Sequence, residues 1–229
     1  MTIRTGLLCV ALMAAGAARA EDFTTIPPPA LDQLQTANTT ETVVLAGGCF
    51  WGVQGVFQHV KGVTSAVSGY AGGAPATASY DRVSDGDTGH AEAVQVTYDP
   101  KQISLGRLLQ IYFSVAHDPT QLNKQGPDHG TQYRSAIFPA NDSQAGIARA
   151  YIVQLNLAHV YKAPVATKIE PGKVFYAAES YHQDYLTLHP TDGYIAYSDI
   201  PKVRELARRY PALYRPEPVL VGSGDLPQN

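Results

Sequence analysis

The sequence is poor in cysteine, in charged residues and in the motifs that hold cofactors. No CxxC, HExxH or glycine-rich phosphate loop occurs, and the seven histidines show no close ligand spacing with cysteine or acidic residues, so we expect no metal and no bound cofactor. Charged residues are 16% of the chain against 45% hydrophobic, which argues against wholesale disorder. The net charge is -3 and no basic run stands out, which argues against nucleic acid as a partner.

The N-terminus has the three regions of a secretory signal peptide. Arg4 supplies the positive charge, Leu7 to Ala15 form an apolar stretch too short to span a bilayer, and Ala18-Arg19-Ala20 gives a small-x-small cleavage pattern. We therefore expect residues 1–20 to be removed and the mature protein to be exported, periplasmic or secreted, with no membrane span. Cys9 leaves with this segment, so Cys49 remains as the one cysteine, and a leftover cysteine in an exported protein suggests a reactive thiol.

The rest of the chain is expected to form one catalytic domain, at residues 41–214. Residues 21–40 contain three consecutive prolines and many polar residues, which predicts an extended N-terminal arm. Residues 215–229 are rich in proline and glycine, which predicts a loose C-terminal tail. No internal repeat is present, and we expect a monomer.

Predicted strands and helices interleave along the domain. Apolar or alternating runs predict strands at 42–46, 62–70, 90–98, 132–138, 165–169 and 174–177, with a Pro171-Gly172 turn between the last two. Helical spacing and caps predict helices from near Cys49, from Ser104 to about 112, from 141 or 142 to about 157, at 180–188 and at 201–210. This order predicts an α/β fold (an α+β sandwich), with a ferredoxin-like core and a central mixed β-sheet flanked by helices.

Cys49 lies between a predicted strand and a predicted helix, in the run GCFWG. Backbone N–H groups at a helix start favour a thiolate, but they contribute only ~0.3–1 kcal/mol, less than one pKa unit. Cys49 alone would therefore stay mostly a thiol at neutral pH, and a proton acceptor or the substrate must assist it. A buried structural cysteine is the alternative. Phe50 and Trp51 fit equally well as core residues or as an apolar pocket for a small methyl group.

Glu92 shares one face of its predicted strand with Val94 and Val96. A partly buried carboxyl group has a raised pKa and stays protonated, which makes it a proton donor. A strand-end glutamate that reaches solvent or pairs with an arginine is the alternative.

Four sequence blocks, in this order, resemble the A-type peptide-methionine sulfoxide reductases. They are GCFWG at 48–52, GHAEAVQVTYDP at 89–100, DHGTQYRSAIF at 128–138 and FYAAESYHQDYL at 175–186, and the closing YPALY is also similar. The resemblance covers most of residues 42–185. It implies a reductase that acts on the S epimer of methionine sulfoxide, free or in oxidised proteins and peptides.

The resemblance also implies a role for each site residue. Cys49 resembles the nucleophile that attacks the sulfoxide sulfur, and Glu92 the acid that protonates the sulfoxide oxygen. Around them it implies walls of the methyl pocket (Phe50 and Trp51), two phenols that hydrogen bond the oxygen (Tyr80 and Tyr133), an accessory polar residue (Asp128), and two residues behind the site (Glu179 and His182).

Many family members carry resolving cysteines near the C-terminus, but this chain has no cysteine after Cys49. Its sulfenic acid cannot close to an intramolecular disulfide, so we expect an external dithiol, such as a thioredoxin-like protein, to recycle it. The residues alone leave three alternatives: a single-cysteine peroxidase or redox sensor, a Cys-His hydrolase using Cys49 and His182, and a non-catalytic tyrosine-rich binding module.

Overall fold

The computed structural model of the protein describes residues 26–33 and 40–222. The predicted signal peptide and its cleavage point lie outside the described residues. In the part of the chain that is described, no helix is both long enough and apolar enough to cross a bilayer.

A six-stranded mixed sheet forms the centre of the protein, in the order β7-β6-β1-β3-β2-β8. Only the β6–β7 pair is parallel among the pairs in this sheet. The predicted central mixed sheet is thus confirmed. Its strands are β1 (Glu41–Gly47), β2 (Val63–Ala71), β3 (Ala91–Tyr98), β6 (Ser135–Phe138), β7 (Lys168–Ile169) and β8 (Phe175–Ala177), and a separate hairpin joins β4 (Lys124–Gln125) to β5 (Asp128–His129).

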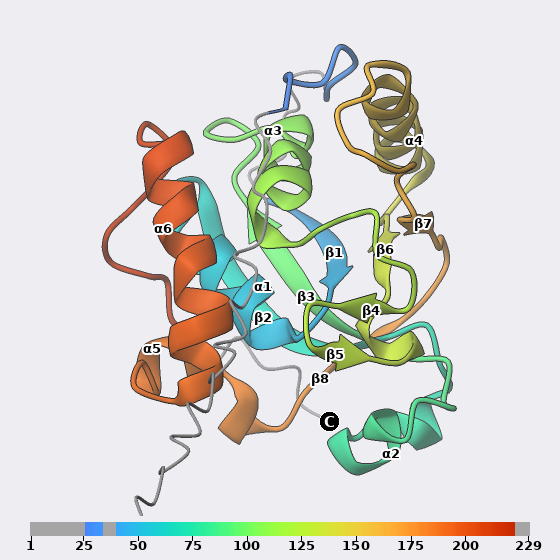
Figure 1. Ribbon diagram of the computed structural model, residues 1–229, viewed down its shortest axis with the longest axis vertical. Helices are drawn as coiled ribbons and strands as arrows, with labels where there is room; N and C mark the ends of the chain where they lie inside the picture. Colours follow the sequence, from blue (N-terminus) through green and yellow to red (C-terminus); the bar gives the residue numbers. More distant parts are fainter. Residues whose placement is uncertain (1–25, 34–39, 223–229) are drawn as a thin grey trace, which may run out of the picture.

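Helices flank the sheet, as the sequence predicts. They are α1 (Phe50–Gln58), α2 (Tyr80–Ser84), α3 (Leu105–Ile111), α4 (Asp142–Leu157), α5 (Tyr185–Leu188) and α6 (Ile200–Arg209). Figure 1 shows α3 and α4 at one end of the molecule and α2 and α5 at the opposite end. The expected caps are confirmed: the side chain of Ser104 accepts a hydrogen bond from the Arg107 N–H, and that of Asn141 accepts one from the Gln144 N–H.

The core packs α1 against β2 and β3. The apolar positions of α1 that the sequence spaces at helical intervals, Val53, Val56 and Phe57, are at most 1% exposed. Val94 and Val96 on β3 are fully buried, as their shared strand face predicts. The helix that begins after Cys49 is therefore held firmly on the sheet, which fixes the turn before it.

The two strands near the Pro171-Gly172 turn do not pair with each other. β7 lies beside β6 at one edge of the sheet, whereas β8 lies beside β2 at the other edge. The chain between them crosses the whole sheet. Short-range sequence pattern predicts each strand but carries no information on which neighbour it pairs with.

The helix predicted over 180–188 is interrupted, and its continuous form is wrong. A 3-10 turn at Ser180–His182 is separated from α5 by Gln183, which is extended, and by Asp184, whose φ is +58°. Tertiary hydrogen bonds account for the break, because the Gln183 side chain bonds both the N–H and the C=O of Ser68 at 2.9 and 3.0 Å. The Asp184 N–H is also taken, by Gln54 Oε1 at 2.9 Å.

Both ends of the described chain are attached to the domain. In the N-terminal arm, the carbonyl of Pro27 accepts a hydrogen bond from Tyr151 of α4 at 2.6 Å, and Ile26 is 3% exposed. The predicted tail is not loose over residues 215–222, because the N–H of Val219 bonds Gln58 O and that of Val221 bonds Asp184. The first of these bonds satisfies a carbonyl group at the end of α1, and the second holds the segment to the Asp184 carboxylate.

Candidate active site

Cys49 occupies a turn that only glycine can precede. It is the N-cap of α1, directly after the end of β1 and Gly48; its thiol forms no disulfide, and the residue as a whole is partly exposed. Gly48 has φ +90°, and a Cβ there would lie 2.6 Å from the Gln125 side chain. A Cβ on Gly47 would lie 2.9 Å from the His117 ring. Backbone and neighbours thus fix the position of Cys49 closely.

Glu92 lies next to this turn, on β3, and is 4% exposed. Its Oε2 accepts a hydrogen bond from the N–H of Phe50, the residue after Cys49, at 3.0 Å. Burial raises the pKa of Glu92 to about 8, against the opposing effect of this hydrogen bond. The carboxyl group is therefore mostly protonated at neutral pH, which is the state of a proton donor.

The thiol is also held in its neutral form. Burial of the sulfur atom raises the pKa of Cys49 well above its ordinary value, and negative charge on Glu92, once that group ionises, and on Asp199 raises it further. The N–H of Trp51 opposes them by hydrogen bonding the sulfur, which lowers the pKa. The small effect of a helix start, expected from the sequence, is thus outweighed here.

Aromatic rings form a wall beside Cys49. The indole of Trp51 stacks on Tyr185 with 3.9 Å between ring centroids and 10° between planes. The Trp51 Nε1–H donates to His182 Nδ1 at 3.3 Å, and the Phe50 and His182 rings lie 5.0 Å apart. Tyr194 meets Trp51 edge to face at 6.2 Å. Phe50 is buried and Trp51 partly exposed, so this cluster offers an apolar surface beside the thiol.

Two phenols and a carboxylate complete the cluster. The pKa values of Tyr80 and Tyr133 are raised by burial first and by the charge of Glu92 second, and both also respond to Cys49. Each phenol therefore stays protonated and can donate a hydrogen bond. Asp128 Oδ2 accepts a hydrogen bond from the Tyr194 hydroxyl at 2.5 Å.

Glu179 and His182 hold other residues of the site in place. The Glu179 carboxylate accepts hydrogen bonds from the Tyr70 hydroxyl at 2.8 Å and from the Tyr80 N–H at 3.0 Å. It thereby anchors the first turn of α2, which carries Tyr80. His182 is 2% exposed and its ring lies 4.4 Å from that of Tyr80.

All nine residues named from the sequence thus belong to one region, linked by contacts or by mutual charge effects. Tyr70, Tyr185 and Tyr194 also belong to it and were not named. Tyr185 gave one signal that could have found it, its place in the FYAAESYHQDYL block that carries the family resemblance. Tyr194 gave none, because its partner Asp128 is 66 residues away.

Comparison with known proteins identifies the family. The family model for peptide methionine sulfoxide reductase matches residues 41–212. The chain belongs to this family. Peptide methionine sulfoxide reductase MsrA 2 of Mesorhizobium japonicum is 63% identical over 187 residues, which are 82% of this chain and 96% of that protein. MsrA of Deinococcus radiodurans is 47% identical over 77% of this chain and 85% of that protein.

Solved structures agree with the assignment. Reduced Mxr1 of Saccharomyces cerevisiae has a TM-score of 0.60 and 37% identity, covering 70% of this chain and 91% of that one. Methionine sulfoxide reductase A of Corynebacterium diphtheriae has a TM-score of 0.56 and 35% identity, covering 66% and 76%. The protein is thus an A-type reductase, an oxidoreductase that reduces methionine sulfoxide and so repairs oxidised methionine.

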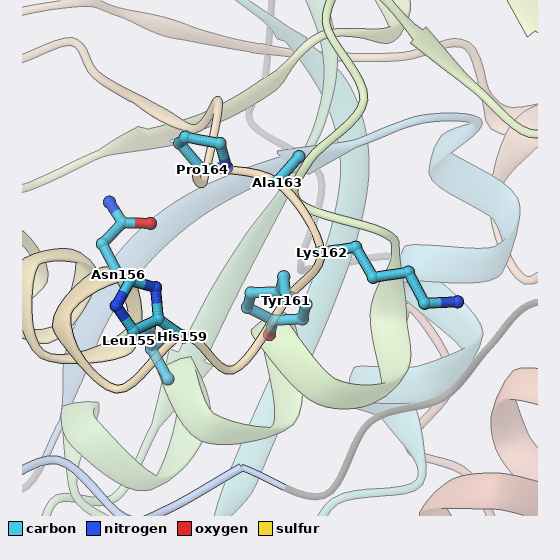
Figure 2. A pocket seen from close by; sticks show the side chains of 7 residues that line it. All are labelled: Leu155, Asn156, His159, Tyr161, Lys162, Ala163 and Pro164. Carbon is cyan, nitrogen blue, oxygen red and sulfur yellow. The ribbon is translucent and has the colours of Figure 1, made fainter.

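A cavity of about 270 Å³ lies apart from the residues around Cys49. Figure 2 shows that its lining comes from the end of α4 and the loop after it, and none of the residues named from the sequence is among them. Within residues 26–33 and 40–222, no group of three His, Cys, Asp or Glu residues is placed to hold a metal ion.

Proposed function

We propose that the protein reduces methionine S-sulfoxide through Cys49, with Glu92 as the acid. The observation that carries this proposal is the buried carboxyl group of Glu92, which accepts a hydrogen bond at 3.0 Å from the N–H of Phe50, the residue that follows the thiol. Burial raises the pKa of this carboxyl group to about 8, which favours its neutral form. A sulfoxide oxygen leaves only once it is protonated, so sulfur attack and proton donation must occur together.

The reaction balances without any cofactor. The Cys49 sulfur attacks the sulfoxide sulfur while Glu92 gives its proton to the oxygen, and the proton released by the thiol returns to Glu92. The hydroxyl group then moves from the substrate sulfur to the Cys49 sulfur, and the bond between the two sulfur atoms breaks with its electron pair going to the methionine sulfur. Methionine leaves, reduced by two electrons, and Cys49 is oxidised to a sulfenic acid.

The surrounding groups match the two ends of the reacting sulfoxide. Tyr80 and Tyr133 are protonated phenols, close enough to Cys49 and Glu92 for charge on either to raise their pKa values. Both phenols donate hydrogen bonds to the sulfoxide oxygen. Phe50 and Trp51 hold the methyl group on the apolar side. Asp128 orients Tyr194, whose ring contacts Trp51.

Recycling requires a thiol from outside the chain. A partner thiol attacks the sulfenic acid, releasing water and forming a mixed disulfide, and a second partner thiol then releases Cys49 and leaves a disulfide on the partner. A dithiol protein of the thioredoxin type fits this role. The partly exposed position of Cys49 supports such docking.

We further propose that the enzyme acts as an exported monomer, periplasmic or secreted, on oxidised proteins and peptides. The three-part N-terminus of residues 1–20 supports export. N-terminal sequencing of exported material should begin at Glu21, and a sequence beginning at Met1 would refute the export.

The reaction is tested without any reductant. Both methionines, Met1 and Met13, lie in the predicted signal, so a chain starting at Glu21 has none that could take up oxygen itself. With methionine S-sulfoxide it should release one methionine per chain, gain the mass of one oxygen atom at Cys49, and stop. Cys49→Ser should release none. Continued turnover without added thiol, or oxygen gained elsewhere, contradicts the proposal.

A further inference from the structure

A buried ion pair lies against the first turn of α1, the helix that begins after Cys49. Asp199 is the last residue of η5, a π-helical turn over Ile195–Asp199, and Lys202 lies in the first turn of α6. Lys202 Nζ is 3.2 Å from Asp199 Oδ1, and the two residues are 2% and 0% exposed. A pair this deep is a poor source of stability, because removing two charges from water costs about as much as their attraction returns.

The pair packs directly against the first turn of α1. A Cβ on Gly52, the third residue after Cys49, would lie 2.1 Å from Asp199 Oδ1 and 3.1 Å from Lys202 Nζ. Only glycine allows this approach. Asp199 and Lys202 thus touch the same helical turn whose N–H groups face the thiol and Glu92.

Three carboxyl groups act on the thiol from different elements: Glu92 of β3, Asp128 of β5 and Asp199 of η5. Each raises the pKa of Cys49, and the phenols of Tyr80, Tyr133 and Tyr194 face the same sulfur. Lys202 brings a positive charge into this region. Burial lowers the pKa of His117, the ring that packs against Gly47 in the turn before Cys49, and the charge of Lys202 adds a smaller lowering effect.

We propose that the Asp199–Lys202 pair is a positioning device for the reduction step, which fixes the first turn of α1 from beneath and offsets the negative charge around Cys49. The inference rests on the proposed role of Cys49 as nucleophile. Lys202 does not touch the substrate and acts through the turn and its charge. The segment around Ile195 packs against α1 and leads into this pair.

The test separates charge from packing with three variants. Lys202→Met keeps most of the chain length but removes the positive charge, Asp199→Asn removes the negative charge, and the double variant removes both. The pKa of the Cys49 thiol is measured from the pH dependence of its alkylation by iodoacetamide, which needs no turnover. Single-turnover release of methionine from the sulfoxide is the second readout. Lys173→Met, at an exposed position, is the control.

The two single variants should shift the thiol pKa in opposite directions. Lys202→Met should raise it by about one unit or more and slow methionine release at least tenfold, whereas Asp199→Asn should lower it. The double variant should return close to the parent, and Lys173→Met should not differ from it. If the pair had only a structural role, both single variants would lose methionine release in proportion to their loss of stability, and the thiol pKa would not shift in opposite directions.

Shifts in the same direction, or no shift in either single variant, would overturn the proposal. If Lys202→Met does not fold, Asp199→Asn decides, because an unchanged thiol pKa in that variant refutes the charge effect. Failure of the proposed function is a separate result: the parent would then release no methionine, while alkylation would still report the pKa.

Discussion

Replacing Glu92 by glutamine tests the acid most directly. The carboxamide keeps an oxygen for the Phe50 N–H, which donates to Glu92 Oε2 at 3.0 Å, so the turn around Cys49 should stay in place. Only the acidic proton is lost. General acids contribute ~10²–10⁴-fold, so release of methionine in a single turnover should slow by at least a hundredfold.

The same group predicts how the parent responds to pH. With its pKa at about 8, Glu92 is about nine-tenths protonated at pH 7, and the acid form disappears as the pH rises through 8. The reduction step should therefore slow from pH 7 to 9 in the parent. Glu92→Gln should lack this limb of the profile, because its side chain does not titrate.

Stability should also fall as the pH rises, but over a lower pH range. The group ionises near 4.5 in an unfolded chain and at about 8 in the folded one, so unfolding releases a proton between these values. The free energy of unfolding therefore falls as pH rises through this window, by about 1.4 kcal/mol per unit. From pH 4.5 to 7 the parent loses about 3 kcal/mol from this group, and Glu92→Gln should be spared that loss.

Rapid-quench experiments measure the rate of methionine release in a single turnover, and urea unfolding at several pH values measures the free energy of unfolding. Glu217→Gln, the same change at an exposed position, is the control and should alter neither. A rate loss below tenfold would remove Glu92 from the role of acid. A stability slope that is unchanged in Glu92→Gln would show that the group is not neutral in the folded protein.

Three further predictions concern the turn before Cys49, the N-cap of α4 and the indole of Trp51. The Gly48→Ala variant should unfold at a lower urea concentration and lose most of its methionine release, because the φ of Gly48 is +90° and the Gln125 side chain blocks a Cβ there. The control is Gly146→Ala in α4, where a Cβ meets no neighbour, and its free energy of unfolding should rise by about 0.5–1 kcal/mol. Asn141→Ala should cost about 1 kcal/mol in urea unfolding with no change in methionine release. Fluorescence of Trp51, the only tryptophan, should change when Cys49 is oxidised, and an unchanged spectrum would place the ring away from the reaction.

Local sequence determined the elements that carry the reaction. The β-branched run before Gly47 and the helical spacing after Cys49 place the thiol at a strand-to-helix turn, because backbone geometry there depends on neighbouring residues. Strand alternation puts Glu92 on the buried face with Val94. It left a solvent-facing or arginine-paired glutamate open, and the resemblance of the surrounding block decided for the acid. Side-chain caps of α3 and α4 were visible in the local sequence, since donor and acceptor are three residues apart.

Only the tertiary structure decided which distant residues meet that turn. The sheet order sends β7 and β8 to opposite edges, and the hydrogen bonds of Gln183 break the helix expected over 180–188. The stacking of Tyr185 on Trp51 and the seating of Asp199 beneath Gly52 join segments more than a hundred residues apart. Periodicity reports which face of an element is buried but not what buries it, because that depends on strand order and helix packing across the whole chain.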